Sequence, residues 1–307
     1  MTSDVIRRAI SLAVSGGQPF HLQLTGGEPT LVPGLVEEAA SLAFNAGECF
    51  SIGIQTNGTC LTSDLIAIIK KYQMEVGVSL DGPPSIHEQQ RGRASETFRG
   101  LQLLERENIP FRVTTVVTQD NVPFLDRPVL SLSGFGCARG IGLDLLVAKG
   151  RTIKGSGGVS TADLPSLQKG LQSMLKTLDA LNAERNIPIR LRDLLITAGK
   201  NRRGTFCHAC LAESIAVSPD GKIFPCGQTL GDEQFAAGTV WAPELENLKT
   251  LQQCKPDNTE CSTCILEQIC SGDCPSRIYY NRNIKGITAC DIYLTLRQFN
   301  FIDFGKK

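Results

Sequence analysis

The sequence predicts an α/β protein in which helices pack on a parallel sheet and a smaller cysteine-rich region follows. Between residues 18 and 150, short apolar segments alternate with amphipathic ones at a spacing of about 30 residues, which is typical of right-handed β-α-β units. After residue 200 cysteines become dense and helical periodicity fades. An open doubly wound sheet and a barrel both fit the first pattern.

Length and charge limit the class of protein. The chain has 307 residues, with 31 basic and 31 acidic side chains and a formal net charge of zero. It is long enough for one large α/β unit and an appendage. Zero net charge gives no general attraction to nucleic acid or to an anionic membrane. No segment reaches the roughly 18–20 apolar residues that span a bilayer, and no signal peptide is recognisable. We therefore expect a cytoplasmic protein that binds neither nucleic acid nor membrane.

The chain opens on a helix, with Thr2, Ser3 and Asp4 as candidate N-caps and Gly16-Gly17 as a stop signal. Apolar runs that end in polar turns then predict strands over 20–29, 50–58, 75–83, 111–120 and 141–149. Helices are predicted between them over 33–47, 62–72, 95–108 and 122–133. Pro123 and Pro128 interrupt the last helix. A β-α series that begins with a helix lacks its first strand.

The remaining chain divides by composition. Residues 150–160 have the glycine- and serine-rich composition of a linker, and a long helix is predicted over 162–185. We therefore predict a β-α domain over 1–150, a linker and bridging helix over 151–199, and a cysteine-rich domain over 200–307.

Nine of the twelve cysteines lie after residue 200, and eight of these form a spacing pattern. The pattern is Cys207-x2-Cys210, ten residues to Gly221, four residues to Cys226, then Cys261-x2-Cys264-x5-Cys270-x3-Cys274 and finally Cys290. Disulfides are rare in the cytosol, so metal is the first explanation. Four thiolates bind one [4Fe–4S] cluster, and structural zinc also uses paired Cys-x2-Cys. Spacing alone leaves iron–sulfur and zinc open. The other cysteines fit buried small hydrophobic residues: Cys49, Cys60, Cys137 and Cys254.

The segments CHACLAESIAVSPDGKIFPC and CSTCILEQICSGDC, with Cys290, resemble the SPASM domain, which carries the auxiliary clusters of radical S-adenosylmethionine enzymes. The resemblance implies two auxiliary [4Fe–4S] clusters. The first would be bound by Cys207, Cys210, Cys226 and Cys274, and the second by Cys261, Cys264, Cys270 and Cys290. The seven-cysteine core of the family begins at Cys210, so Cys207 lies outside that core.

The turn Gly26-Gly27-Glu28-Pro29 resembles the family motif that holds the amino group of S-adenosylmethionine. Other contacts with this cofactor are implied for Ser79 and Asp81 at the end of strand 75–83, for Asn57 in QTNG, and for Arg91. Without the resemblance, each residue also fits an ordinary turn or loop. The implied fold is a partial (β/α)6 radical-SAM barrel that lacks its first strand.

The family's defining motif, C-x3-C-x2-C, which binds the radical-initiating cluster, does not occur in the sequence. Two explanations stay open: an N-terminally truncated chain, or a natural variant that no longer initiates radicals. In the first case a third [4Fe–4S] cluster would accompany the missing segment. Either way, we expect residues 1–307 alone to be inactive.

The function that the resemblance implies is a peptide- or protein-modifying maturase that abstracts a side-chain hydrogen and forms a crosslink. Gly227 follows Cys226 where sulfatase-maturing members carry an acid, which argues against that subclass. A reductant protein and a leader-peptide-binding partner would accompany a peptide or protein substrate. The alternatives are a non-catalytic iron–sulfur electron-transfer or peptide-binding protein and a zinc-stabilised binding protein. The sequence identifies no general base.

Overall fold

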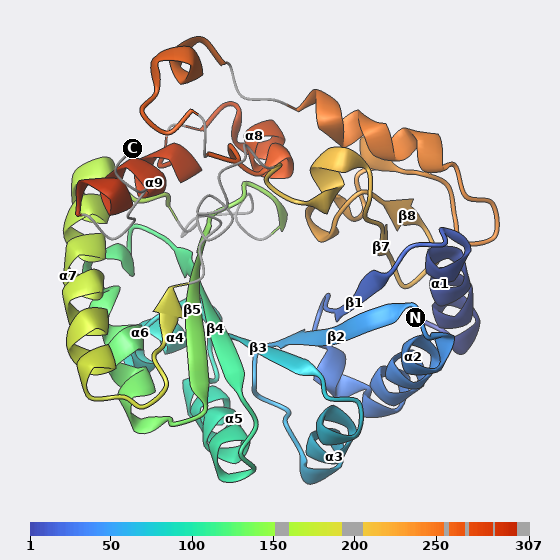
Figure 1. The fold of residues 1–307 in the computed structure, drawn as a ribbon, viewed down its shortest axis with the longest axis horizontal. Coiled ribbons are helices and arrows are strands. Elements are labelled where there is room, and N and C mark those ends of the chain that lie inside the picture. The colour runs from blue at the N-terminus through green and yellow to red at the C-terminus, as the bar shows by residue number, and fades with distance from the viewer. Residues whose placement is uncertain (151–159, 192–204, 255–257, 268–269, 285, 300–307) are drawn as a thin grey trace.

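The computed structural model describes residues 1–150, 160–191, 205–254, 258–267, 270–284 and 286–299. A curved parallel sheet carries helices on its outer side, and the cysteine-rich segment lies across the other side (Figure 1). The linker predicted over 150–160 and the domain boundary predicted near residue 200 fall almost entirely outside the described residues.

The elements of the sheet region alternate as the sequence predicts. The strands are β1 (Phe20–Leu24), β2 (Cys49–Thr56), β3 (Glu75–Ser79), β4 (Phe111–Val117), β5 (Ala138–Leu145) and β6 (Arg190–Leu191). The helices are α1 (Ser3–Ser15), α2 (Pro33–Ala46), α3 (Ser63–Lys71), α4 (Pro84–Arg91), α5 (Ala94–Arg106), α6 (Asp126–Ser131) and α7 (Leu164–Ala183).

The six strands pair in sequence order, β1-β2-β3-β4-β5-β6, and all are parallel. Sequential order with a helix between neighbouring strands is the arrangement of a (β/α) barrel, so the predicted fold class is confirmed. Among the described residues β1 and β6 do not pair with each other, and no strand pairs with the outer edge of β1. The hydrogen-bonded sheet is therefore an open arc.

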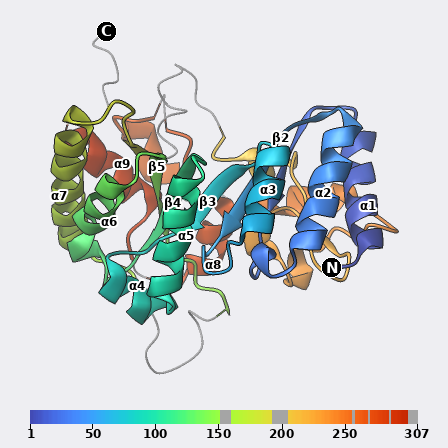
Figure 2. The same ribbon diagram turned by 90° about the horizontal axis from the view of Figure 1, so that it is seen from below.

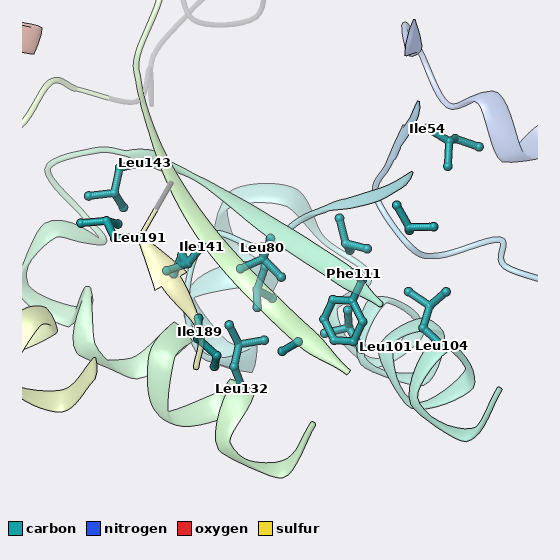
Figure 3. Packing of buried hydrophobic residues seen from close by; sticks show 14 of the residues in the cluster. Ile54, Leu80, Leu101, Leu104, Phe111, Leu132, Ile141, Leu143, Ile189 and Leu191 are labelled. Carbon is teal, nitrogen blue, oxygen red and sulfur yellow. The ribbon is translucent and has the colours of Figure 1, made fainter. Parts of the chain in front are cut away.

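The core lies between the sheet and its helices. Alternate strand residues such as Ile54, Phe111 and Ile141 point outward and meet Leu101 and Leu104 of α5 and other helix residues (Figure 3). All five are at most 1% exposed. Each fully buried side chain of this size contributes about 1.5–3 kcal/mol of transfer free energy. On the described strands, the residues that alternate with these point to the concave face and are mostly only partly buried.

Local signals set most helix boundaries. The Thr2 hydroxyl accepts a hydrogen bond from the Val5 amide at 3.4 Å and caps α1, as predicted. The helix predicted over 122–133 is instead a 3-10 turn at Val122–Phe124 followed by the short α6, because proline cannot donate within a helix. Helix α4 was not predicted, because the prolines at 83 and 84 resemble a turn. Pro84, however, occupies the first helical position, where proline is favoured.

The cysteine-rich segment contains more helix than its sequence indicates. It holds the two-stranded antiparallel β7 (Ala216–Val217) and β8 (Ile223–Phe224), and the helices α8 (Pro275–Asn281) and α9 (Ala289–Gln298). Helical periodicity fades after residue 200, and α8 and α9 were therefore not assigned from the sequence. Pro275 starts the first, and a capping box between Thr288 and Asp291 starts the second.

This segment contacts both ends of the open sheet. Val5 of α1 packs with Ile223, Val240 and Leu248. The Trp241 indole donates a 3.1 Å hydrogen bond to Asp4. At the other end α9 lies beside α7, in agreement between Figures 1 and 2. Within the described residues, no helix is both long enough and apolar enough to cross a membrane.

Gly100 in α5 allows the turn after β2 to approach the helix closely. A Cβ at this position would lie 2.1 Å from the Gly58 carbonyl oxygen. Glycine to alanine in a helix is normally favourable, but here the obstacle is backbone. We expect Gly100→Ala to lower the free energy of unfolding by about 1–3 kcal/mol, measured by urea denaturation.

The matched control is Gly34→Ala in α2, where an added Cβ has no neighbour within 4 Å. This variant should match or exceed the wild type. Equal stability of Gly100→Ala and the wild type would contradict the steric argument.

Candidate functional site

The concave face of the sheet is polar. The His21 Nδ1 shares a 2.6 Å hydrogen bond with the Ser51 hydroxyl. The His21 Nε2 shares one of 3.2 Å with the Gln23 Oε1. The Gln55 amide donates to the Ser79 hydroxyl at 3.3 Å. These contacts join β1, β2 and β3 on the face away from the helices. A barrel filled only by its own strands would carry bulky apolar side chains there, so this face is built to meet something polar.

Glycines on the neighbouring strands let the glutamines lie flat. Gln23 is the register partner of Gly53, and Gln55 of Gly77. A Cβ on Gly53 would lie 2.6 Å from the Gln23 Oε1, and one on Gly77 would lie 2.2 Å from the Gln55 Oε1. Each glutamine therefore covers the backbone of the next strand. Sequence reasoning missed this arrangement, although glycine inside a strand indicates a close approach.

The turn after β1 holds Glu28 in a dense set of hydrogen bonds. Gly26 has φ +130, a conformation that favours glycine. The Glu28 Oε1 accepts hydrogen bonds from the Thr30 amide at 3.2 Å, the Thr30 hydroxyl at 2.6 Å and the Thr56 hydroxyl at 2.6 Å. Its Oε2 accepts from the Asn57 amide at 2.7 Å. The carboxylate thus joins the carboxyl ends of β1 and β2, and its role as an acceptor for the cofactor's ammonium group stays a prediction.

Asn57 supports the same corner. Its Oδ1 accepts a 2.9 Å hydrogen bond from the Thr59 amide, and its carbonyl accepts one of 2.9 Å from the Thr97 hydroxyl of α5. The side chain therefore forms the local turn that the sequence also allowed. The structure brings Asn57 and Glu28 together, while Gly26, Gly27 and Pro29 shape the turn beside them.

Asp81 and Arg91 form an ion pair at the end of β3. Asp81 is 4% exposed. Arg91 donates to it through Nε and, at 3.3 Å, through Nη2, while the Val116 amide donates to its Oδ1 at 2.8 Å. Two residues that the sequence assigned to separate cofactor contacts are therefore partners of each other. Ser79 lies on the concave face nearby and binds Gln55 rather than this pair.

Buried polar residues that the sequence did not single out hold this corner. The His87 Nδ1 accepts a 3.2 Å hydrogen bond from the Asp81 amide, and burial lowers the pKa of its imidazole. The Asn121 amide donates to the carbonyls of Asp81 and Val116 at 3.0 and 2.8 Å. The TQDN run after β4 was the available signal, since polar residues at adjacent strand ends meet at one edge of a parallel sheet.

The cysteines of the first predicted set occupy neighbouring turns. The sulfurs of Cys207 and Cys210 are 3.7 Å apart. Their mutual interaction lowers the pKa of Cys210 to about 6 and raises that of Cys207. Burial raises the pKa of the Cys274 thiol, which also feels the charge of Cys226. Cys207 and Cys226 both pack against the small core around Phe224.

The cysteines of the second predicted set also lie near one another. Partial burial raises the pKa of the Cys290 thiol to about 11, with the charges of Cys270, Asp273 and Cys261 adding to the shift. Cys264 and Cys270 pack against the main core rather than the small one. Among the described residues no three metal-ligating side chains converge to metal-binding distance. Thiolates are the donors that [4Fe–4S] clusters use, and the two four-cysteine ligand sets stay predictions.

The segment after β5 joins the sheet to the cysteine-rich region. The Asn281 side chain of α8 donates to the Leu146 carbonyl and accepts from the Ala148 amide, both at 2.8 Å. Lys149 donates to the carbonyls of Gln228 and Leu230 at 2.7 and 2.8 Å, in the turn that follows Cys226. The cysteine turns are therefore fixed at the carboxyl end of the sheet, on the side of its concave face.

Comparisons with known proteins agree with this architecture. The family described as the radical SAM superfamily matches residues 1–122. The chain is 25% identical over 293 residues to a serine-type anaerobic sulfatase-maturating enzyme of Klebsiella aerogenes, covering 89% of this chain and 71% of that protein. It is 26% identical over 301 residues to an AdoMet-dependent heme synthase of Methanosarcina barkeri, covering 91% and 83%.

A solved structure has the same fold. Native anSMEcpe with bound AdoMet and the Kp18Cys peptide superposes with a TM-score of 0.71 at 19% identity, covering 98% of this chain and 89% of that chain. The likeness extends through the cysteine-rich region as well as the sheet.

The hydrogen bonds of Glu28 provide a test of the corner between β1 and β2. In Glu28→Gln the side-chain amide must face either the Asn57 amide, which is a donor, or the threonine donors. We expect a loss of about 1–3 kcal/mol in the free energy of unfolding, measured by urea denaturation. Glu48→Gln, at an exposed loop position, is the control and should change stability by less than about 0.5 kcal/mol. Equal stability of both variants would mean that the Glu28 bonds are not formed in solution.

Proposed function

We propose that this chain is part of an enzyme that modifies peptide or protein side chains by hydrogen abstraction. The proposal starts from the resemblance of the chain to SPASM-domain maturases of the radical S-adenosylmethionine type. The observation that carries the proposal is the seam between β5 and α8. It holds the cysteine turns over the same concave, polar face on which the turns after β1, β2 and β3 open. A reacting side chain on that face would lie between the turns after β1, β2 and β3, where the cofactor would bind, and the cysteines.

Each part of the face has a role in this proposal. S-adenosylmethionine would lie at the carboxyl ends of the strands, along Gly26, Gly27, Asn57 and Ser79, with the Glu28 carboxylate fixing the turn that receives it. Asp81 would hold Arg91 for the cofactor's carboxylate. When bound with a reduced [4Fe–4S] cluster, this cofactor supplies the 5′-deoxyadenosyl radical that takes the substrate hydrogen. The protein's contribution is to bind, orient and shield the reacting groups.

Two auxiliary [4Fe–4S] clusters complete the site. The first would be bound by Cys207, Cys210, Cys226 and Cys274, and the second by Cys261, Cys264, Cys270 and Cys290. In the enzyme they would take up the electron that remains after substrate oxidation, with a reductant protein as electron source. A leader-peptide-binding partner would deliver the substrate. Crosslink formation is the favoured outcome, since Gly227 leaves no acid beside Cys226.

The substrate class rests on what similar proteins are known to bind or make. The solved structure with the same fold holds a peptide, and one relative matures sulfatases. Another relative is a heme synthase, so similarity alone does not separate a peptide from a tetrapyrrole. The polar concave face favours the peptide, whose backbone offers donors and acceptors to Gln23, Gln55 and Ser79.

Metal analysis tests the cysteine assignment. Anaerobically reconstituted protein should hold about eight iron and eight sulfide per chain, because each four-thiolate site binds one cubane. Cys226→Ser and Cys264→Ser should each lose about half of the iron. Cys254→Ser is the control, because Cys254 packs beside the first site without belonging to it, and it should keep the full content. About two zinc per chain, with no sulfide, would instead support the zinc-stabilised binding protein.

Cofactor cleavage tests the role of this chain in radical initiation. Residues 1–307 contain no C-x3-C-x2-C motif, and we propose that they do not cleave S-adenosylmethionine alone. The outer edge of β1 is where a further parallel strand carrying that motif would pair. Reconstituted protein with dithionite and S-adenosylmethionine should yield no 5′-deoxyadenosine by liquid chromatography above a protein-free control. Turnover would overturn the proposal, whereas binding of S-adenosylmethionine without cleavage distinguishes it from an electron-transfer protein that binds no cofactor.

A further inference from the structure

Arg277 is a buried cation at the seam between the sheet and the cysteine-rich region. It lies in the first turn of α8, and its side chain is only 7% exposed. A guanidinium removed from water in this way needs compensating negative charge. Two carboxylates provide it. Arg277 donates hydrogen bonds to the Asp273 carboxylate from Nε, at 2.9 Å, and from Nη2. It donates another, of 3.2 Å, from Nη1 to the Asp144 carboxylate.

Two of the neighbours of Arg277, Asp273 and Phe206, directly precede cysteines. Asp273 directly precedes Cys274, and its Oδ2 accepts a 3.0 Å hydrogen bond from the Ala289 amide, which directly precedes Cys290. The guanidinium carbon lies 5.8 Å from the centre of the Phe206 ring, and Phe206 directly precedes Cys207. The positive charge therefore lies between the chain segments that bring Cys207 and Cys274 to the first predicted cluster.

Asp144 connects this charge to the concave face. Buried and partly buried residues alternate along β5, and Asp144 is the last residue of the partly buried set, on the side away from the core. Its side chain is 45% exposed. A small pocket beside Asp144 and Arg277 is otherwise lined by the core residues Leu143, Leu145, Ala289, Ile292 and Tyr293. One carboxylate of the pair is thus buried beside the cysteines, while the other is accessible from the face where a substrate would lie.

We propose that Arg277 is a positioning residue that raises the reduction potential of the first auxiliary cluster. Asp144 partly neutralises the guanidinium charge and so lowers the effect of Arg277 on that potential. The inference rests on the proposed function, because it requires a cluster on Cys207, Cys210, Cys226 and Cys274. One-electron reduction adds negative charge to the cluster. A desolvated cation nearby favours the reduced state, because charges interact strongly where water is excluded, and groups around the ligands tune a metal's potential.

The two residues have opposite effects. Removing the guanidinium takes away a buried positive charge beside Cys274, so the midpoint potential becomes more negative. Removing the Asp144 charge leaves the guanidinium less neutralised, so the midpoint potential becomes more positive. A purely structural role would not give opposite signs, since loosening the seam in either way would expose the cluster to the same solvent.

The test is a mediated redox titration at pH 8, followed by electron paramagnetic resonance, on reconstituted 1–307 with iron content measured in each sample. Arg277→Met should shift the midpoint of one auxiliary signal to more negative values, Asp144→Asn should shift the same signal to more positive values, and Arg277→Lys should stay close to the wild type. Glu75→Gln is the matched control. Glu75 is also a strand carboxylate and pairs with Arg112 at 3.1 Å, but it lies at the amino end of the sheet, and it should shift neither signal.

The outcomes separate the two proposals. Shifts of the same sign in Arg277→Met and Asp144→Asn, or no shift at full iron content, would overturn the role of Arg277 while leaving the clusters in place. Absence of iron and sulfide from the wild type would overturn the cluster assignment and this inference together. If Arg277→Met fails to assemble, Asp144→Asn decides alone: a positive shift supports the proposal, and an unchanged or negative midpoint refutes it.

Discussion

In the part of the chain that the structure describes, the two end strands of the sheet do not pair with each other, and the cysteine-rich segment is arranged around that open sheet. Neighbouring strands pair from β1 to β6, and the two end strands do not meet within the described residues. A polar concave face in an open arc would be filled by water alone. The cysteine-rich segment covers it by packing on α1 at one end and by hydrogen bonding to the residues after β5 at the other. The cysteine-rich segment thus contacts both ends of the described sheet.

This division explains the roles of the carboxylates at the strand ends. Glu28 and Asp81 are both engaged by protein donors, and each joins segments that the parallel sheet alone would leave separate. Their acidity serves to hold turns in place before any ligand binds.

The sequence predicted the parts of the fold that depend on local pattern. Strands β1 to β5 are apolar runs, and α1, α2, α3, α5 and α7 carry clear periodicity, so their positions follow from the spacing of apolar residues. The two-residue β6 was missed because it is a strand only through its pairing with Gly140 and Ile141. Helix α4 was hidden by its prolines. The cross-strand partners of Glu28 and Asp81 could not be predicted, since Thr56, Asn57 and Val116 lie 28 to 35 positions away and meet them only through the register of the strands.

The depth of the concave face depends on two glycines, which have no side chain. Gln23 and Gln55 lie against the sheet because Gly53 and Gly77 have no Cβ. A single alanine at either site would lift a glutamine away from the backbone and raise the floor of the face by the length of its amide. Selection for binding larger or smaller molecules could therefore act on these two positions without changing Glu28, Asp81 or the cysteines. Among homologous proteins, the choice of glycine or alanine at these positions would then vary with the size of the substrate.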